Sequence, residues 1–288
     1  MTLPRRLVVL AAVVATLSGC AISPRDPRLG PPHIDTRHSS RNQDSRVRYL
    51  ILHYTQLDFE RSLEVLTQDR VSSHYLVGID PPRSYRLVPE SRRAWHAGQS
   101  YWQGDTALNS SSIGIEIVNL GPDAAPGVGF MPFPETQIDE VIRLVRDIAR
   151  RHDIAPHRIL GHSDIAPQRK IDPGPRFPWR RLFDAGLIPW PDGAQVAAQQ
   201  KQFERNLPDI AWFQTQLAVH GFEVPRHGLL DEPTRRVLAN FQAKYRPGDF
   251  DGSPDAETAA LLEVINRPAG QLLRQRDGRV TPYILNVR

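Results

Sequence analysis

The chain contains the run Tyr49-Leu50-Ile51-Leu52-His53-Tyr54, in which apolar residues are not interrupted until His53. A short run without alternation between apolar and polar residues is typical of a strand that is buried on both faces. A second strand is expected at residues 113–118, and shorter strands at residues 75–77 and 86–88. These runs predict an interior sheet with His53 at the end of its most buried strand.

Helical patterns alternate with these strands. Residues 59–66 fit a short helix, and apolar residues recur at helical spacing between Ile138 and Ala149. Thr136 and Asp139 together form an expected N-terminal cap for this second helix. Strands that alternate with helices predict an α/β layer domain, which we place at residues 46–190.

Two histidines and one aspartate stand out as candidate metal ligands. His162 follows the apolar run 159–161 at the edge of an element, and Asp172 precedes the rigid Pro173-Gly174-Pro175 turn. Alone, His53 would more often be a core or surface histidine, and an aspartate before proline is ordinary turn chemistry. Together, two imidazoles and a carboxylate form the ligand set that catalytic zinc uses when its fourth position stays open for water. The combination predicts a zinc-dependent hydrolase.

Hydrolysis also needs a proton acceptor and positive charge near the reacting carbonyl. Glu116 lies within the apolar strand at residues 113–118, where an acid is rare unless it is paired or functional. The alternative is a strand whose other face is wet. Lys170 would lie on the same side as Asp172 if that segment is extended, although a plain surface lysine is the alternative. We predict Glu116 and Lys170 as catalytic residues.

Five blocks of the chain resemble the type 2 N-acetylmuramoyl-L-alanine amidases, which share a fold with the peptidoglycan recognition proteins. The resemblance covers roughly residues 46–190 and rests on His53-Tyr54-Thr55, residues 71–77, Ala94-Trp95-His96-Ala97-Gly98, Asn109 with residues 112–116, and residues 161–174. It implies a mixed central sheet flanked by helices.

The resemblance also implies chemistry for named residues. Zinc would be held by His53, His162 and Asp172, with Glu116 as the catalytic carboxylate and Lys170 as the transition-state stabiliser. The reaction would be hydrolysis of the amide between the lactyl group of N-acetylmuramic acid and L-alanine of the stem peptide. The residues expected to bind substrate are Tyr54, Trp95, His96 and Asn109, for which packing roles are the alternative.

The C-terminal part reads as a separate small module. Residues 191–206 are polar and predict a linker or a poorly packed helix, and residues 207–267 give three helical faces separated by turns. This three-helix pattern resembles the peptidoglycan-binding domain that accompanies cell-wall hydrolases, which would raise the local concentration of polymer substrate. A structural cap on the catalytic domain is the alternative. Residues 268–288 are arginine-rich and unassigned.

The N-terminus has the features of a secretion signal. Arg5 and Arg6 precede an apolar stretch, and the chain's single cysteine, Cys20, follows Leu17-Ser18-Gly19. This end resembles a bacterial lipobox, which implies a signal peptide at residues 1–20 and a lipid anchor on Cys20. Residues 21–45 predict a flexible tether. The residue after Cys20 is alanine, which in this resemblance favours the outer membrane, with the protein facing the periplasm. An ordinary secretory signal is the alternative.

Three other functions fit the sequence less well. The formal net charge is +4, but no basic run is interleaved with aromatic residues, so we do not expect a nucleic acid partner. A non-catalytic peptidoglycan receptor of the same fold would be expected to lack metal ligands that are present here. A zinc protease of another fold would need a His-Glu-x-x-His helix, which the sequence lacks. Protein partners, oligomeric state and the size of the substrate stay open.

Overall fold

The computed structural model of this protein describes residues 31–123 and 129–284. The chain divides into two units, residues 1–43 and 44–288. In the first, the described residues 31–43 are exposed and contain no helix or strand, and Asp35 pairs with Arg37. Cys20 and the predicted signal peptide lie outside the described residues. None of the helices in the described ranges has the length and apolar character needed to cross a membrane.

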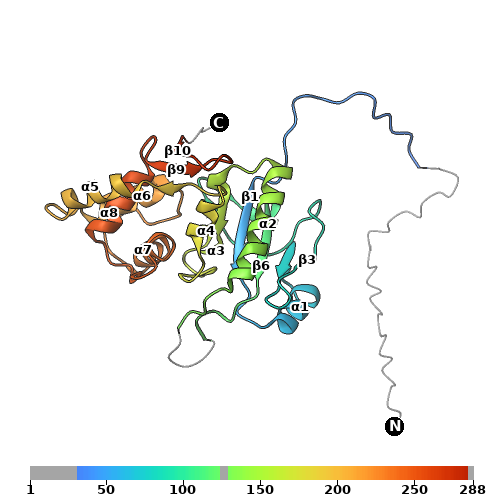
Figure 1. The fold of residues 1–288 in the computed structure, drawn as a ribbon, viewed down its shortest axis with the longest axis horizontal. Helices are drawn as coiled ribbons and strands as arrows, with labels where there is room; N and C mark the ends of the chain where they lie inside the picture. The colour runs from blue at the N-terminus through green and yellow to red at the C-terminus, as the bar shows by residue number, and fades with distance from the viewer. Residues whose placement is uncertain (1–30, 124–128, 285–288) are drawn as a thin grey trace, which may run out of the picture. The chain divides into compact units, whose positions relative to one another are not determined.

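The second unit contains a five-stranded mixed sheet, which confirms the predicted fold class (Figure 1). Its strand order is β3-β2-β6-β1-β7, in which β2, β6, β1 and β7 are parallel and β3 is antiparallel to β2. The strands are β1 Tyr49–Tyr54, β2 Tyr75–Val77, β3 Ser84–Arg86, β6 Ser112–Ile117 and β7 Ile159–Gly161. All six residues of β1 are buried, as the sequence predicts.

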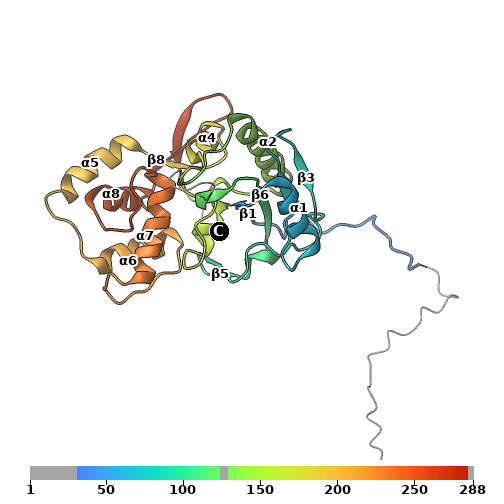
Figure 2. The same ribbon diagram turned by 90° about the horizontal axis from the view of Figure 1, so that it is seen from below.

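Helices and short elements cover this sheet and connect its strands (Figures 1 and 2). They are α1 Phe59–Gln68, β4 Tyr101–Trp102, β5 Asp105–Thr106, the 3-10 helices η1 Leu108–Ser110, η2 Gly121–Asp123 and η3 Pro156–Arg158, α2 Glu135–His152, α3 His162–Ile165 and α4 Trp179–Asp184. The predicted cap of α2 is wrong. Pro134 is the N-cap residue and Thr136 already lies in the first turn.

The two faces of the sheet pack against different partners. Leu50 and Leu52 of β1 belong to one core cluster with the apolar face of α2, where Val141 and Val145 are fully buried. Residues of a strand alternate between faces. Ile51 therefore lies on the opposite face, in a second cluster that includes residues of the C-terminal helices. His53 is on this second face, two residues further along.

The C-terminal part is helical and returns to the sheet-containing part. Its elements are β8 Trp190–Pro191, α5 Gly193–Phe203, α6 Ile210–His220, α7 Glu232–Tyr245, α8 Ala256–Ile265, β9 Gln271–Arg274 and β10 Val280–Tyr283. Figure 2 shows α5–α8 gathered beside the sheet. Helix α5 lies in the segment predicted as a linker and packs against α8. The unassigned tail supplies β9 and β10, and β9 pairs with β8.

Candidate metal centre and active site

Parallel strands end at one edge of the sheet, and the candidate residues meet there. His53 is the fifth residue of β1, and Glu116 is its register partner in β6. His162 begins α3 directly after β7, which is the other neighbour of β1. The carboxyl ends of adjacent parallel strands form a natural site for a ligand. In β6, Ile113 and Ile115 face the core, which leaves Glu116 on the same side as His53.

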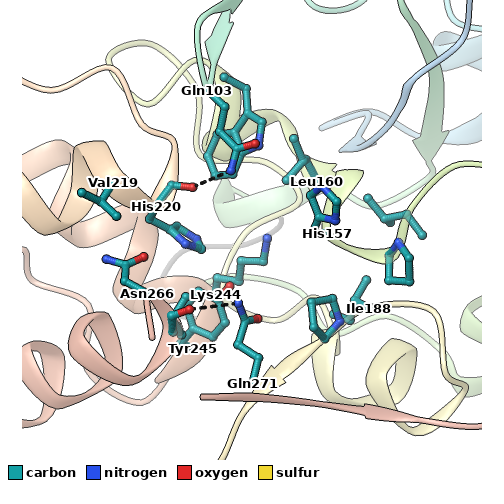
Figure 3. Close-up of a pocket in the computed structure, with 15 residues that line it drawn as sticks. Gln103, His157, Leu160, Ile188, Val219, His220, Lys244, Tyr245, Asn266 and Gln271 are labelled. Atoms are coloured by element: carbon teal, nitrogen blue, oxygen red, sulfur yellow. Dashed lines mark hydrogen bonds between the residues drawn. The ribbon is translucent and has the colours of Figure 1, made fainter. Parts of the chain in front are cut away.

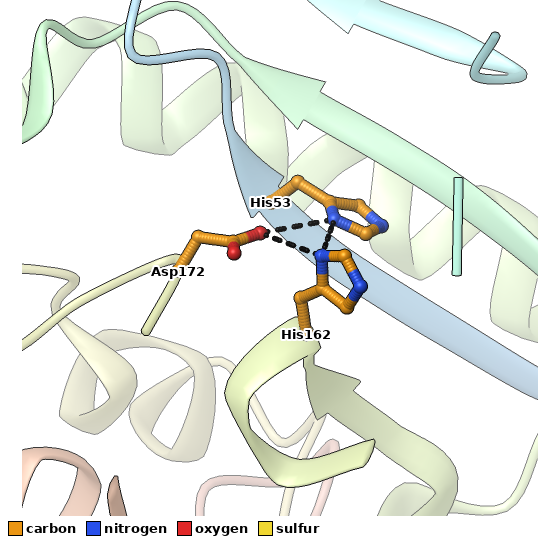
Figure 4. A group of neighbouring side chains, drawn as sticks. All are labelled: His53, His162 and Asp172. Atoms are coloured by element: carbon orange, nitrogen blue, oxygen red, sulfur yellow. Dashed lines mark hydrogen bonds and ion pairs between the residues drawn. The ribbon is translucent and has the colours of Figure 1, made fainter. Parts of the chain in front are cut away.

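Three ligand atoms converge at this edge (Figure 4). His53 Nδ1 lies 3.0 Å from Asp172 Oδ2 and 3.0 Å from His162 Nδ1, and His162 Nδ1 lies 3.1 Å from the same Asp172 oxygen. The side chains of His53, His162 and Asp172 are 1%, 4% and 7% exposed. The three residues that the sequence singled out are thus brought together in a buried cluster, although His53 is more than a hundred residues from the other two.

A chain of hydrogen bonds fixes the proton of His53. The Ser112 hydroxyl donates to the carbonyl of Leu108 at 2.6 Å, so its oxygen is free to accept from His96 Nε2 at 3.2 Å. His96 Nδ1 then carries no proton and accepts from His53 Nε2 at 3.0 Å. His53 therefore holds its proton on Nε2, and its Nδ1 presents a lone pair to His162 and Asp172.

The proton of His162 is fixed in the same way. Its Nε2 lies 3.2 Å from the carbonyl oxygen of Ala97, which can only accept. The Arg169 guanidinium, which can only donate, is further from this nitrogen, at 3.5 Å, and already donates to the carbonyls of Ala97 and Gln99. The shorter contact places the proton of His162 on Nε2. Burial lowers the pKa of His53 to about 4, which keeps that imidazole neutral. Burial alone would raise the pKa of Asp172, but the facing imidazoles of His162 and His53 hold it below its usual range.

Three lone pairs on neighbouring buried atoms cannot satisfy one another, because no proton lies between them. A cation resolves this conflict, and two imidazole nitrogens with one carboxylate oxygen match the donor set of catalytic zinc. The other ring N–H of each histidine donates a hydrogen bond, from His53 to His96 Nδ1 and from His162 to the Ala97 carbonyl. Metal-binding histidines generally have such a partner. The residues present therefore fit a divalent metal ion, and zinc suits this donor set.

Glu116 and Lys170 line the same cavity as the three ligands. The Oε2 atom of Glu116 is buried and has no hydrogen-bond partner in the described part of the chain. Burial, with a smaller effect of the Asp172 carboxylate, raises the pKa of Glu116 well above its usual range. Lys170 is exposed and follows the turn at residues 167–169, and its backbone N–H donates to the Ala166 carbonyl.

The cavity has a volume of about 190 Å³, and residues of β1, β6 and α1 are among those that line it. Tyr54, Trp95 and His96 line it, and Trp95 is 51% exposed with the Arg93 guanidinium 4.0 Å from its ring centre. Asn109 is not among the lining residues. Its side-chain oxygen accepts from the backbone N–H groups of His96 and Ala97 at 2.9 and 2.7 Å, which holds the Trp95–Gly98 loop. Substrate contact by these residues stays a prediction.

Sequence reasoning gave no role to three residues that shape the site. Ser112 and Gly114 belong to the block at residues 112–116, and both lie on the face of β6 that carries Glu116. Only glycine fits at position 114, because a Cβ there would lie 2.5 Å from the His96 ring. Arg169 donates to the carbonyls of Ala97 and Gln99, the latter at 2.7 Å. Nothing in its sequence context distinguishes it from a surface arginine.

Comparison with known proteins supports this chemistry. The family model for N-acetylmuramoyl-L-alanine amidase matches residues 43–175, and a peptidoglycan binding domain model matches residues 206–262. The N-acetylmuramoyl-L-alanine amidase AmiD of Escherichia coli is 41% identical over 275 residues, which covers 93% of this chain and 99% of that protein.

Solved structures agree with the sequence relatives. AMPDH3 from Pseudomonas aeruginosa, in complex with anhydromuramic pentapeptide, superposes with a TM-score of 0.74 at 40% identity, covering 80% of this chain and 96% of that one. E. coli AmiD with the substrate anhydro-N-acetylmuramic acid-L-Ala-D-gamma-Glu-L-Lys gives a TM-score of 0.72 at 41% identity, covering 80% and 92%. With the His53–His162–Asp172 cluster intact, this chain belongs to the N-acetylmuramoyl-L-alanine amidase family.

Proposed function

We propose that this chain uses zinc to hydrolyse the amide between the lactyl group of N-acetylmuramic acid and L-alanine. The observation that carries the proposal is the convergence of three lone pairs, on His53 Nδ1, His162 Nδ1 and Asp172 Oδ2, within 3.1 Å of one another. These three residues would hold the ion. When bound, zinc supplies a water whose pKa is about 7 and polarises a carbonyl oxygen.

Glu116 and Lys170 complete the chemistry. The Glu116 carboxylate accepts a proton from the attacking water and returns it to the leaving amine of L-alanine. The raised pKa of Glu116 suits this task, because a carboxyl group with a higher pKa holds the proton between the two transfers. The Lys170 ammonium offsets negative charge that develops on the carbonyl oxygen in the transition state.

The substrate class follows from the relatives. Two related structures hold anhydromuramic peptides, so we infer that soluble anhydro-muropeptides fit this cavity. Tyr54, Trp95 and His96, which line the cavity, are the proposed substrate contacts. Asn109 is also proposed to take part in substrate binding, and it holds the loop that carries Trp95 and His96. The module at residues 207–267 would bind peptidoglycan and bring the enzyme to the intact wall.

Peptide release from purified muropeptides tests the activity. We expect release to stop after chelation and to return with added zinc. Glu116→Gln should retain zinc and lose roughly 100-fold or more in kcat, because it removes the proton acceptor and not a metal ligand. Undiminished release by protein shown to be free of zinc would overturn the mechanism.

Two rival functions give different results in the same assay. A non-catalytic receptor would bind muropeptides and contain no zinc after purification, so metal analysis of the protein separates it from the enzyme. A protease would cleave a stem peptide that lacks the sugar. We expect no cleavage of that peptide, because the scissile bond of the proposed reaction joins the sugar's lactyl group to the peptide.

We also propose the domain plan and location that the N-terminus implies. Residues 1–20 would be a signal peptide, Cys20 the lipidated residue, residues 21–45 a tether, residues 46–190 the catalytic domain and residues 191–206 the linking segment, which contains α5. The protein would face the periplasm from the outer membrane. Cells fed a labelled fatty acid should label the wild-type protein and leave Cys20→Ser unlabelled. Equal labelling of both would rule out this anchor.

A further inference from the structure

Helix α7 of the C-terminal module carries three polar side chains on one face. Arg236, Asn240 and Lys244 are spaced four residues apart, which places them one above another along the helix. All three contact the chain between the two predicted ligands His162 and Asp172. The module is therefore in direct contact with the segment that carries Lys170.

Two of these side chains bind backbone carbonyls of that segment. Arg236 Nη1 donates to the carbonyl of Gln168 at 2.7 Å. Asn240 Nδ2 donates to the carbonyls of Pro167 at 3.1 Å and Lys170 at 3.2 Å. One amide group thus joins both ends of the turn that precedes Asp172. Carbonyls in such a turn have no strand or helix partner, so their position depends on the donors that α7 provides.

The third contact is a buried ion pair. Lys244 Nζ lies 2.6 Å from Asp164 Oδ2, and the two side chains are 9% and 2% exposed. The same Asp164 oxygen accepts from the backbone N–H of Gly161 at 2.8 Å, immediately before His162. A buried pair tolerates little displacement, because separation would leave an unpaired charge in the interior. Lys244 therefore fixes α7 against the start of α3.

Apolar residues of α7 also pack against the catalytic part, and Ile51 and Leu160 of the sheet share a buried cluster with Leu238 and Phe241 of α7. Figure 3 shows Lys244 and Tyr245 of α7 across a small cavity from His157 and Leu160. His157 lies in η3, just before β7, and Leu160 lies in β7. The volume of this small cavity, about 50 Å³, is well below the 190 Å³ of the cavity at the predicted metal ligands. The contact between α7 and the catalytic part is thus a packed interface, which can transmit position.

We propose that α7 is a positioning element of the active site, in which Asn240 sets the place of Lys170 through the carbonyls of Pro167 and Lys170. This inference rests on the proposed role of Lys170 in catalysis. It gives the C-terminal module a task that is separate from binding polymer. Asn240 acts through Lys170 and is a positioning residue, and it is not expected to touch substrate.

A double-mutant cycle on a soluble muropeptide tests this, because a small substrate does not need polymer binding. Asn240→Ala should lower kcat about 10- to 100-fold with KM changed less than about threefold, since misplacement of a reacting group by about 1 Å has this effect. In a Lys170→Met background, Asn240→Ala should lower kcat no further. Zinc content should be unchanged in all variants.

Asn266→Ala is the matched control. Its side-chain amide donates to the Gln216 carbonyl and Oε1 at 2.9 and 2.8 Å, wholly within the module. It should lower thermal stability as much as Asn240→Ala and leave kcat at the wild-type value. Hydrogen exchange gives a readout besides activity. The amides of Arg169 and Lys170, which donate to Ala166, should exchange about tenfold faster in Asn240→Ala than in the control.

The outcomes separate the inference from the proposed function. Wild-type kcat in Asn240→Ala, or an equal loss in both backgrounds, overturns the positioning role and leaves the proposed function standing. Wild-type kcat in Lys170→Met would remove Lys170 from the mechanism and the inference with it.

Discussion

Ser112 controls the proton of His53 without touching it. Its hydroxyl proton is committed to Leu108, so it accepts from His96, and His96 in turn accepts from His53. The lone pair that His53 offers to a metal ion is therefore selected two hydrogen bonds away. Hydrogen-bond partners of the ligands orient metal-binding histidines in this way in many proteins.

Ser112→Ala should weaken zinc binding about 10-fold or more. Without the acceptor, the Nε2–H of His96 is buried and unpaired, which favours the other tautomer of His96 and removes the acceptor of His53. Competition with a chelator of known affinity measures the effect. Ser73→Ala is the control, because Ser73 is buried and its hydroxyl has no hydrogen-bond partner in the described part of the chain. Equal zinc affinity of the two variants would contradict the hydrogen-bond chain.

Strand alternation explains how much of the site the sequence could predict. In β6, Ile113 and Ile115 point to the core and leave the acid at 116 on the site face, so an acid within an apolar run is informative. The motif at residues 161–174 identified two ligands because it is local. The turn at Lys170 was not predictable in this way, because its shape depends on Asn240, which lies 70 residues further along the chain.

Between secondary-structure elements, Glu90 joins the loop after β3 to β2 and α2. It accepts from the Tyr75 hydroxyl at 2.6 Å and from Arg151 at 2.7 Å, and it pairs with His152 at 2.8 Å. Hydrogen bonds from Arg151 lower the pKa of Glu90 to about 2 from an ordinary value of 4.5. A carboxyl group with a lowered folded-state pKa stabilises the fold above its ordinary pKa.

Glu90→Gln should therefore lower the free energy of unfolding by about 1–2 kcal/mol near neutral pH, after allowance for solvent screening. The difference from wild type should shrink as pH falls from about 4.5 towards 2, because in that window Glu90 takes up a proton in the unfolded chain and stays ionised in the folded protein. Urea unfolding at a series of pH values measures this. Glu64→Gln, which removes an exposed pair with Arg61, should change stability little. A difference that stays constant down to pH 2 would refute the assignment.

Across the whole molecule, the catalytic part and the C-terminal helices share a core. One hydrophobic cluster contains Ile51 and Leu160 of the sheet together with Phe213, Leu238 and Phe241 of the helices. The sequence showed apolar faces on each of these helices but predicted a separate module behind a linker. Periodicity identifies which face of a helix is buried, and it does not identify the surface that covers that face.

A shared core predicts that residues 44–284 unfold in one transition. Phe241→Ala, at a fully buried position of α7, should lower stability by about 3–5 kcal/mol and shift the calorimetric midpoint of the whole unit. Leu229→Ala, at a position 65% exposed in the same module, should change it by less than about 0.5 kcal/mol. Amides of β1 and α7 should lose protection together on heating. A cluster that includes Ile51 cannot lose Phe241 and Leu238 while β1 keeps its full protection, so earlier loss of amide protection in α7 would contradict the shared core.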